Sequence, residues 1–121
     1  MAKASFDSNS NPIFVGPLTN VIVATAKLAL SGTRKHKVLV IGEFSAEGSL
    51  ANGYIVGDIQ IDGNTFLNTQ VNNLNGNVGT IVTVTGIVTV SAGKHTFELR
   101  AYTNASSLSV HHRALSVVDL N

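Results

Sequence analysis

TIVTVTGIVTV, Thr80–Val90, consists of β-branched residues around a single glycine and therefore predicts a β-strand. Successive side chains of a strand point to opposite faces, so the valines would share one face and the isoleucines and threonines the other. The two sets are Val82, Val84, Gly86, Val88 and Val90, and Ile81, Thr83, Thr85, Ile87 and Thr89. Neither set is charged, although a strand in a small antiparallel domain normally buries one face and wets the other. The stretch therefore raises the question of what covers its second face.

The strand predicted for Lys35–Ser45 also has two apolar faces. Val38 and Val40 would lie on one side, and Leu39 and Ile41 on the other. The second faces of these two strands would together form an exposed apolar patch that is unusually large for a monomer. Self-association covers such a patch readily, because every copy of the chain brings the same patch. We therefore predict a subunit interface formed by Leu39, Ile41, Ile81, Thr83, Thr85, Ile87 and Leu120. The alternative is that the threonine hydroxyls hydrate this face without a partner.

The composition favours one domain with a polar but uncharged surface. The chain has 121 residues, which is enough for one two-layer core. Charged residues make up 12%, against roughly 25% in ordinary soluble domains. The formal net charge of +1 gives no electrostatic basis for binding nucleic acid or an anionic membrane. The chain contains no cysteine, which excludes disulfides and a thiol nucleophile.

Val, Ile and Thr dominate and turn residues recur at short intervals, which is typical of an all-β protein. We predict strands at Ile13–Val15, Val21–Leu30, Lys35–Ser45, Tyr54–Ile61, Thr65–Gln70, Thr80–Val90, Lys94–Thr103 and Leu108–His112, the last continuing over Leu115–Leu120. Asp62-Gly63 is predicted to be a hairpin turn. These strands fit a single-domain two-sheet antiparallel sandwich, a jelly roll, over residues 13–121. We interpret residues 1–12 as a polar N-terminal arm, for which a neighbouring chain is one candidate docking site.

The last third of the chain carries a family resemblance. A tight turn leads into an alternating strand, a Ser/Thr/Asn-rich loop follows, and a further strand ends the chain. The residues concerned are Ala92, Gly93, His95, Phe97, Leu99, Arg100, Arg113, Leu115, Val117 and Leu120. They resemble the C-terminal half of trimeric TNF/C1q-like jelly-roll domains of bacterial and phage surface proteins, with their aGxH turn, xFxLR strand and RxLxVxdL ending.

This resemblance implies a jelly roll that packs three-fold through one sheet and serves as a head, tip or decoration, without catalysis. The chain departs from the family in lacking a collagen-like repeat and in having only 6% aromatic residues. We therefore predict a non-enzymatic structural or adhesive protein, a self-associating homotrimer displayed on a phage particle, spore surface or fibre. The alternative is a carbohydrate-binding, lectin-like module of the same fold.

The four histidines do not form a metal-binding pattern. His111 and His112 would point to opposite faces of a regular strand, and His36 and His95 are far away in sequence. Three copies of one histidine around a three-fold axis are an alternative route to a metal or anion site. His112 is in phase with Val110, so we expect it to be buried and neutral near pH 7. The sequence also lacks the G-x-S-x-G motif of a nucleophilic serine. We therefore predict no catalytic, cofactor or metal site.

The loop VNNLNGNVGT, Val71–Thr80, is the candidate ligand loop. Asn side chains pair a donor with an acceptor, which suits sugar hydroxyls, although Asn and Gly also serve any tight uncharged loop. The residues in question are Asn72, Asn73, Asn75 and Asn77. Tyr54 and Tyr102 would either stack on a sugar or pack at the rim.

The N-terminal stretch MAKASFDSNSNP has no apolar segment after its lysine, so no secretory signal is predicted. The longest apolar run, Val21–Leu30, is too short to span a membrane and contains Lys27. We expect synthesis in the cytosol and a final location on a virion, spore or cell surface. The expected partners are further copies of the chain, and in addition glycans or a larger particle lattice.

Overall fold

The computed structural model describes residues 4–48, 53–74, 79–104 and 108–121, except for the side chains of residues 72–74. Within these ranges the chain forms nine strands. They are β1 Ala4–Asn9, β2 Ile13–Val15, β3 Val21–Leu30, β4 His36–Glu47, β5 Gly53–Ile61, β6 Asn64–Leu74, β7 Thr80–Val90, β8 Gly93–Thr103 and β9 Leu108–Asp119. The described ranges include no helix that is long and apolar enough to cross a membrane.

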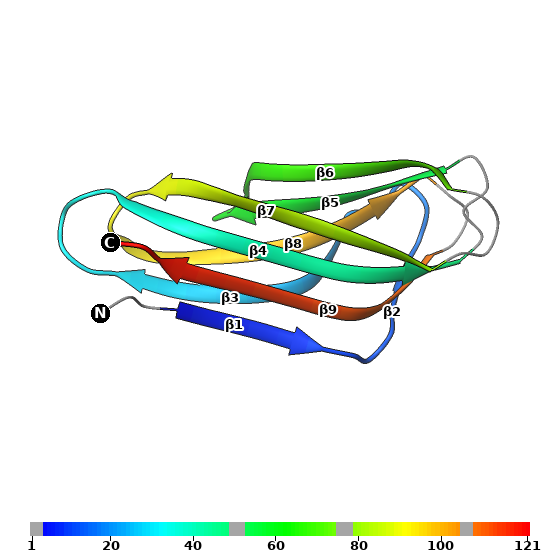
Figure 1. Ribbon diagram of the computed structural model, residues 1–121, viewed down its shortest axis with the longest axis horizontal. Coiled ribbons are helices and arrows are strands. Elements are labelled where there is room, and N and C mark those ends of the chain that lie inside the picture. The colour runs from blue at the N-terminus through cyan, green and yellow to red at the C-terminus, as the bar shows by residue number, and fades with distance from the viewer. Residues whose placement is uncertain (1–3, 49–52, 75–78, 105–107) are drawn as a thin grey trace.

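The strands form two antiparallel sheets that lie face to face (Figure 1). The five-stranded sheet has the order β1-β9-β4-β7, with β2 also paired to β9. The four-stranded sheet has the order β3-β8-β5-β6. Along the chain, β2 to β5 and β6 to β9 alternate between the sheets, whereas β1 and β2 share one sheet and the β5–β6 hairpin lies in the other. This is a Greek-key sandwich, and the predicted all-β jelly roll is confirmed.

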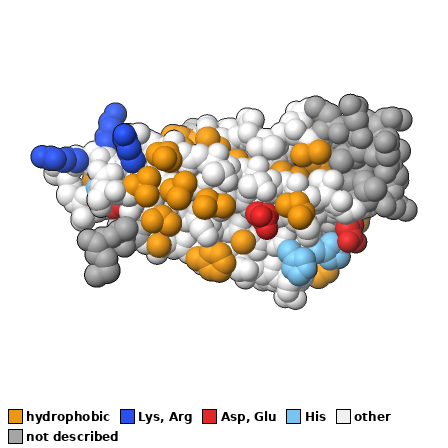
Figure 2. Space-filling model, viewed as in Figure 1, with side chains coloured by type: hydrophobic (Ala, Val, Ile, Leu, Met, Phe, Trp, Pro, Cys, Tyr) orange, Lys and Arg blue, Asp and Glu red, His pale blue; other side chains and the backbone are white. Residues whose placement is uncertain are grey.

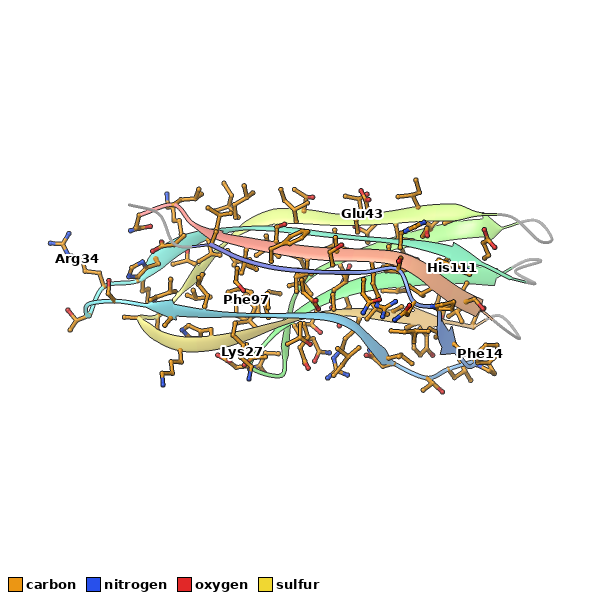
Figure 3. All side chains as sticks on the ribbon, turned by 90° about the horizontal axis from the view of Figure 1, so that it is seen from below. Phe14, Lys27, Arg34, Glu43, Phe97 and His111 are labelled. Carbon is orange, nitrogen blue, oxygen red and sulfur yellow. The ribbon has the colours of Figure 1, made fainter. Side chains whose placement is uncertain are left out.

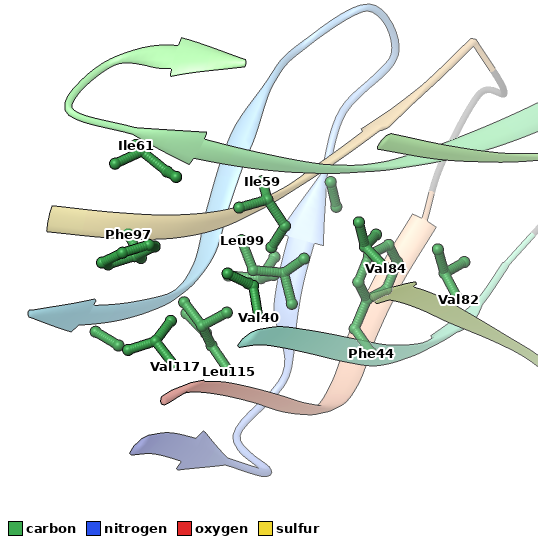
Figure 4. Close-up of a cluster of buried hydrophobic side chains, with 14 of the residues drawn as sticks. Val40, Phe44, Ile59, Ile61, Val82, Val84, Phe97, Leu99, Leu115 and Val117 are labelled. Atoms are coloured by element: carbon green, nitrogen blue, oxygen red, sulfur yellow. The ribbon is translucent and has the colours of Figure 1, made fainter. Parts of the chain in front are cut away.

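The core lies between the sheets and follows the predicted alternation. The β7 valines Val82 and Val84 are buried, whereas Ile81 and Ile87 point outward. Phe97 and Leu115, two residues that carry the family resemblance, are fully buried in the same cluster (Figure 4). Figure 3 shows the two layers from the side, with Phe97 between them, Glu43 outside one sheet and Lys27 outside the other.

Two turns have the predicted backbone geometry. Asp62 and Gly63 join β5 to β6 with φ values of 52° and 87°. Two consecutive positive φ angles are the requirement of a type I′ hairpin turn, which Asp-Gly satisfies. The Asp62 carboxylate also accepts a hydrogen bond from the Thr96 amide at 2.9 Å, which ties the turn to β8. Gly93, at φ 116°, begins β8.

Strand β1 was not predicted, because ASFDSN contains no β-branched residue. Its six residues pair with β9, from Ala4 opposite Val118 to Asn9 opposite Arg113. The Asp7 carboxylate accepts a hydrogen bond from the Thr25 amide at 2.9 Å, which links β1 to the edge of the other sheet. Residues 4–9 therefore dock on their own chain, and long-range pairing outweighs their weak local preference.

Candidate association surface

The outward face of the five-stranded sheet is the most distinctive surface of the molecule, and we call it the association face. The strand register aligns its side chains in straight rows across β1, β9, β4 and β7. Three rows are Ala4–Val118–Leu39–Ile87, Phe6–Ser116–Ile41–Thr85 and Ser8–Ala114–Glu43–Thr83. Phe14, Ile81 and Leu120 add further exposed apolar side chains to the face. Cross-strand neighbours about 5 Å apart make such rows continuous, so the apolar side chains form one surface.

All seven residues predicted for the subunit interface lie on this face. Ile81 is 68% exposed, Ile87 60%, Leu120 48% and Ile41 42%. Leu39 is half-buried, and both threonines are exposed. Figure 2 looks onto this face and shows hydrophobic side chains spread along its length. The structure thus brings the predicted residues together, and their contact with a second subunit stays a prediction.

Two exposed aromatic residues on this face were missed by the sequence reasoning. Phe6 is 65% exposed and extends the row that contains Ile41, while Phe14 is 68% exposed on β2. Phe6 lies in the segment interpreted as an arm. Phe14 alternates with the inward-facing Ile13 and Val15, so the pattern of β2 carried a usable signal.

Charge on the association face lies toward both ends, with Lys37 beside Thr89 at one end of β4 and Glu43 nearer the other. Glu43 is exposed between Ala114 and Thr83 in its row. It lines a hollow of about 340 Å³ together with Ser8, Asn9, Ser10, His112, Arg113 and Ala114. Its carboxylate has no ion-pair partner within the described part of the chain. A subunit that covers this end must supply a donor or leave Glu43 at a wet rim, because a buried unpaired carboxylate is costly.

The predictions for the histidine pair were wrong, because β9 is not a regular strand there. The register shifts between Phe44 and Ala46, so His111 and His112 together lie opposite Ser45. This is a β-bulge, and the His112 amide donates to the Ser45 hydroxyl at 3.1 Å. His112 is exposed instead of buried. His111 is half-buried, with its Nε2 3.7 Å from a Glu47 carboxylate oxygen.

The bulge turns Arg113 inward, where it is 8% exposed. Its guanidinium donates to the carbonyls of Asn11 and His111. This side chain therefore ties the segment between β1 and β2 to β9.

The candidate ligand loop is shorter than predicted. Asn72 and Asn73 belong to strand β6, although their side chains lie outside the described residues, as do Asn75 and Asn77 altogether. The rings of Tyr54 and Tyr102 stack on each other with centroids 6.2 Å apart. They lie on the outward face of the four-stranded sheet, away from the association face.

His36 and His95 each lie between a carboxylate and a backbone carbonyl oxygen. His95 Nδ1 lies 2.6 Å from the Asp62 carboxylate, and Nε2 lies 2.7 Å from the Ser91 carbonyl. The Asp62 carboxylate and the Ser91 carbonyl both accept hydrogen bonds, so they favour the form of His95 in which both ring nitrogens carry a proton. The hydrogen bond to Asp62 raises the pKa of His95, and the Thr96 amide followed by His95 lowers the pKa of Asp62. His36 likewise lies between the Asp119 carboxylate and the Ser31 carbonyl.

No known protein family matches the sequence, and neither does any curated protein. Solved structures do match. The Eiger TNF of S. frugiperda superposes with a TM-score of 0.69 at 10% identity, covering 99% of this chain and 93% of that one. The VP2 subviral particle of infectious bursal disease virus gives a TM-score of 0.65 at 11% identity, and the structure of the Gt strain of infectious bursal disease virus gives 0.59 at 16% identity.

The viral matches cover 99% and 98% of this chain but only 33% and 32% of theirs, so the chain spans about a third of those proteins. Identities this low show the fold alone. The strand order, the two-sheet packing and the near-complete coverage of Eiger TNF agree on that fold. The chain therefore has the fold of a TNF-like jelly roll.

Proposed function

We propose that this chain is a non-enzymatic structural or adhesive protein that self-associates through the association face. One observation carries the proposal. Six of the nine large hydrophobic side chains that are exposed within the described residues point from this single face: Phe6, Phe14, Ile41, Ile81, Ile87 and Leu120. Covering a few hundred Å² of such surface is worth several kcal/mol at about 25 cal/mol per Å².

A homotrimer is the assembly that the sequence resemblance favours. Chains of this fold that expose one apolar sheet face can pack head to tail around a three-fold axis, so that every copy both offers and covers the face. We further propose that the assembly is displayed on a phage particle, spore surface or fibre. The viral neighbour is named as a subviral particle, which supports an assembled, particle-borne role for this fold.

Charge substitution on the association face tests this proposal. Ile87→Lys places an ammonium group where the face would be buried, and an unpaired charge there is strongly unfavourable. We expect size-exclusion chromatography to show a smaller species with the same folded circular dichroism spectrum. Lys27→Glu, on the outer side of the other sheet, is the matched control and should elute like the wild type. An Ile87→Lys protein that elutes and melts like the wild type would contradict the proposed interface.

A further inference from the structure

The outward face of the four-stranded sheet differs in chemistry from the association face. Its central row runs from Asn68 through Asp58 to Arg100, and the adjacent row pairs Val56 with Tyr102. This face therefore carries a carboxylate, a guanidinium, amides and aromatic rings where the other sheet carries aliphatic side chains. It also lies on the opposite side of the sandwich, so it stays accessible when the association face is covered (Figure 3).

Asp58 is the unusual group on this face. It is only 8% exposed, yet it forms no ion pair with the described residues. Its Oδ2 accepts hydrogen bonds from Gln60 Nε2 at 3.1 Å and from the Thr65 hydroxyl at 3.2 Å, whereas Oδ1 has no partner. A carboxylate offers about four acceptor positions, so hydrogen-bonding capacity is left over. A buried carboxylate with unused capacity is rare unless a ligand or water completes it.

Arg100, directly opposite Asp58, does not neutralise it. Its two terminal nitrogens donate to Asn20 at 3.1 Å and to Glu98 at 3.0 Å, and its Nε has no acceptor. The Glu98–Arg100 pair cancels its own charge, so Asp58 leaves this region with one net negative charge. An acceptor and a donor that both lack partners thus lie on opposed residues.

A hollow of about 290 Å³ opens beside these groups. Its lining consists of Asn20, Val56, Asp58, Thr65, Asn68 and Tyr102. The ends of Asn20, Thr65 and Asn68 are exposed, and the Tyr102 ring is backed by the ring of Tyr54. The site therefore combines a carboxylate that accepts, amides that both donate and accept, and an aromatic wall.

We propose that this hollow is a subsite for a neutral sugar, one pyranose unit of a glycan. Vicinal sugar hydroxyls would donate to Asp58 and exchange hydrogen bonds with Asn20 and Asn68, while the C–H face of the ring packs against Tyr102. The net negative charge disfavours anionic sugars. A cation is a poorer fit, because the described residues include no cluster of three or more His, Cys, Asp or Glu side chains. This subsite does not depend on the proposed self-association.

Saturation-transfer NMR on the full chain tests the subsite. The probes are the methyl pyranosides of glucose, galactose, mannose and N-acetylglucosamine at about 10 mM, which detects a Kd near 1 mM, and methyl glucuronide as the anionic comparison. We expect transfer to at least one neutral glycoside and none to the glucuronide. Asp58→Asn, which keeps the shape and removes the charge, should weaken binding at least tenfold by the loss of charge-assisted hydrogen bonds.

Asn68→Ala changes an exposed residue on an edge strand and leaves the core intact. It should also weaken sugar binding, and it is the test of the proposal if Asp58→Asn does not fold. Lys27→Gln on the same sheet and Ile87→Lys on the association face should bind like the wild type. Absence of transfer to all four neutral glycosides would overturn the proposal. Unchanged binding in Asn68→Ala and Asp58→Asn, or loss of wild-type binding on adding EDTA, would do so too.

Discussion

Leu115→Ala tests whether the C-terminal strand is part of the core. Leu115 is fully buried between the sheets, and its cross-strand neighbour on β4 is Gly42. The substitution removes three carbons, worth about 0.8 kcal/mol each, or about 2.4 kcal/mol of transfer free energy. Gly42 has no side chain that can move into the vacated space, so the cavity adds to this loss. We therefore expect the free energy of unfolding to fall by about 3–5 kcal/mol, in the usual range for buried leucines.

For a domain of this size, that loss lowers the Tm by about 10–25 °C. Thermal and urea denaturation at two protein concentrations measure it, and the decrease relative to the wild type should be equal at both. Leu120→Ala is the matched control, because Leu120 is 48% exposed on the association face. Its effect should be small at high protein concentration and grow on dilution. A Leu115→Ala protein that melts within about 3 °C of the wild type would refute the assignment of Leu115 to the core.

Gly57→Val should lower the Tm, because a Cβ at this position would lie 2.8 Å from the methyl groups of two β7 valines; overpacking of this kind costs about 1–3 kcal/mol, and an unchanged urea midpoint would contradict it. The His95–Asp62 pair should stabilise the fold fully below the unfolded pKa of His95, about 6.5, and this contribution should be lost as the pH rises through the raised folded pKa of His95. On the acid side, the contribution of Asp62 should be lost only as the pH falls below about 4. The Tm difference between wild type and His95→Gln should accordingly be largest near pH 5–6 and shrink toward pH 9, and a difference that does not vary with pH would argue against the pair. Deleting residues 1–9 removes all of β1 and should lower the Tm even in a monomeric variant, since one edge of β9 loses its partner; a deletion protein that melts like its parent would show that β1 is dispensable.

The sequence was sufficient for strands β2 to β9 and for the two-faced character of β7 and β4. The alternation of side chains in TIVTVTGIVTV is a local property. The structure keeps it because successive residues of a strand point to opposite faces, so a period of two determines which residues lie on each face. The Asp62-Gly63 turn was predictable for the same reason, since its φ angles depend on the two residues themselves. These features need no knowledge of distant parts of the chain.

Features that depend on distant pairing were not predictable. Strand β1 exists because β9 offers a free edge, and Phe6 joins the association face only through that pairing. The bulge at His111 and His112 follows from the register of β9 against β4, and the sequence HHR contains no periodicity that would predict it. Asp58 looked like an ordinary strand residue, and only the cross-strand positions of Asn68 and Arg100 show it as a buried carboxylate with an unused oxygen.

Light scattering on the wild-type protein across a dilution series tests the central claim most directly. The account predicts a particle with three times the mass of the 12.7 kDa chain, which dissociates on dilution or when Ile87 is replaced by lysine. A monomer of 12.7 kDa at every concentration, with the association face open to solvent, would contradict it.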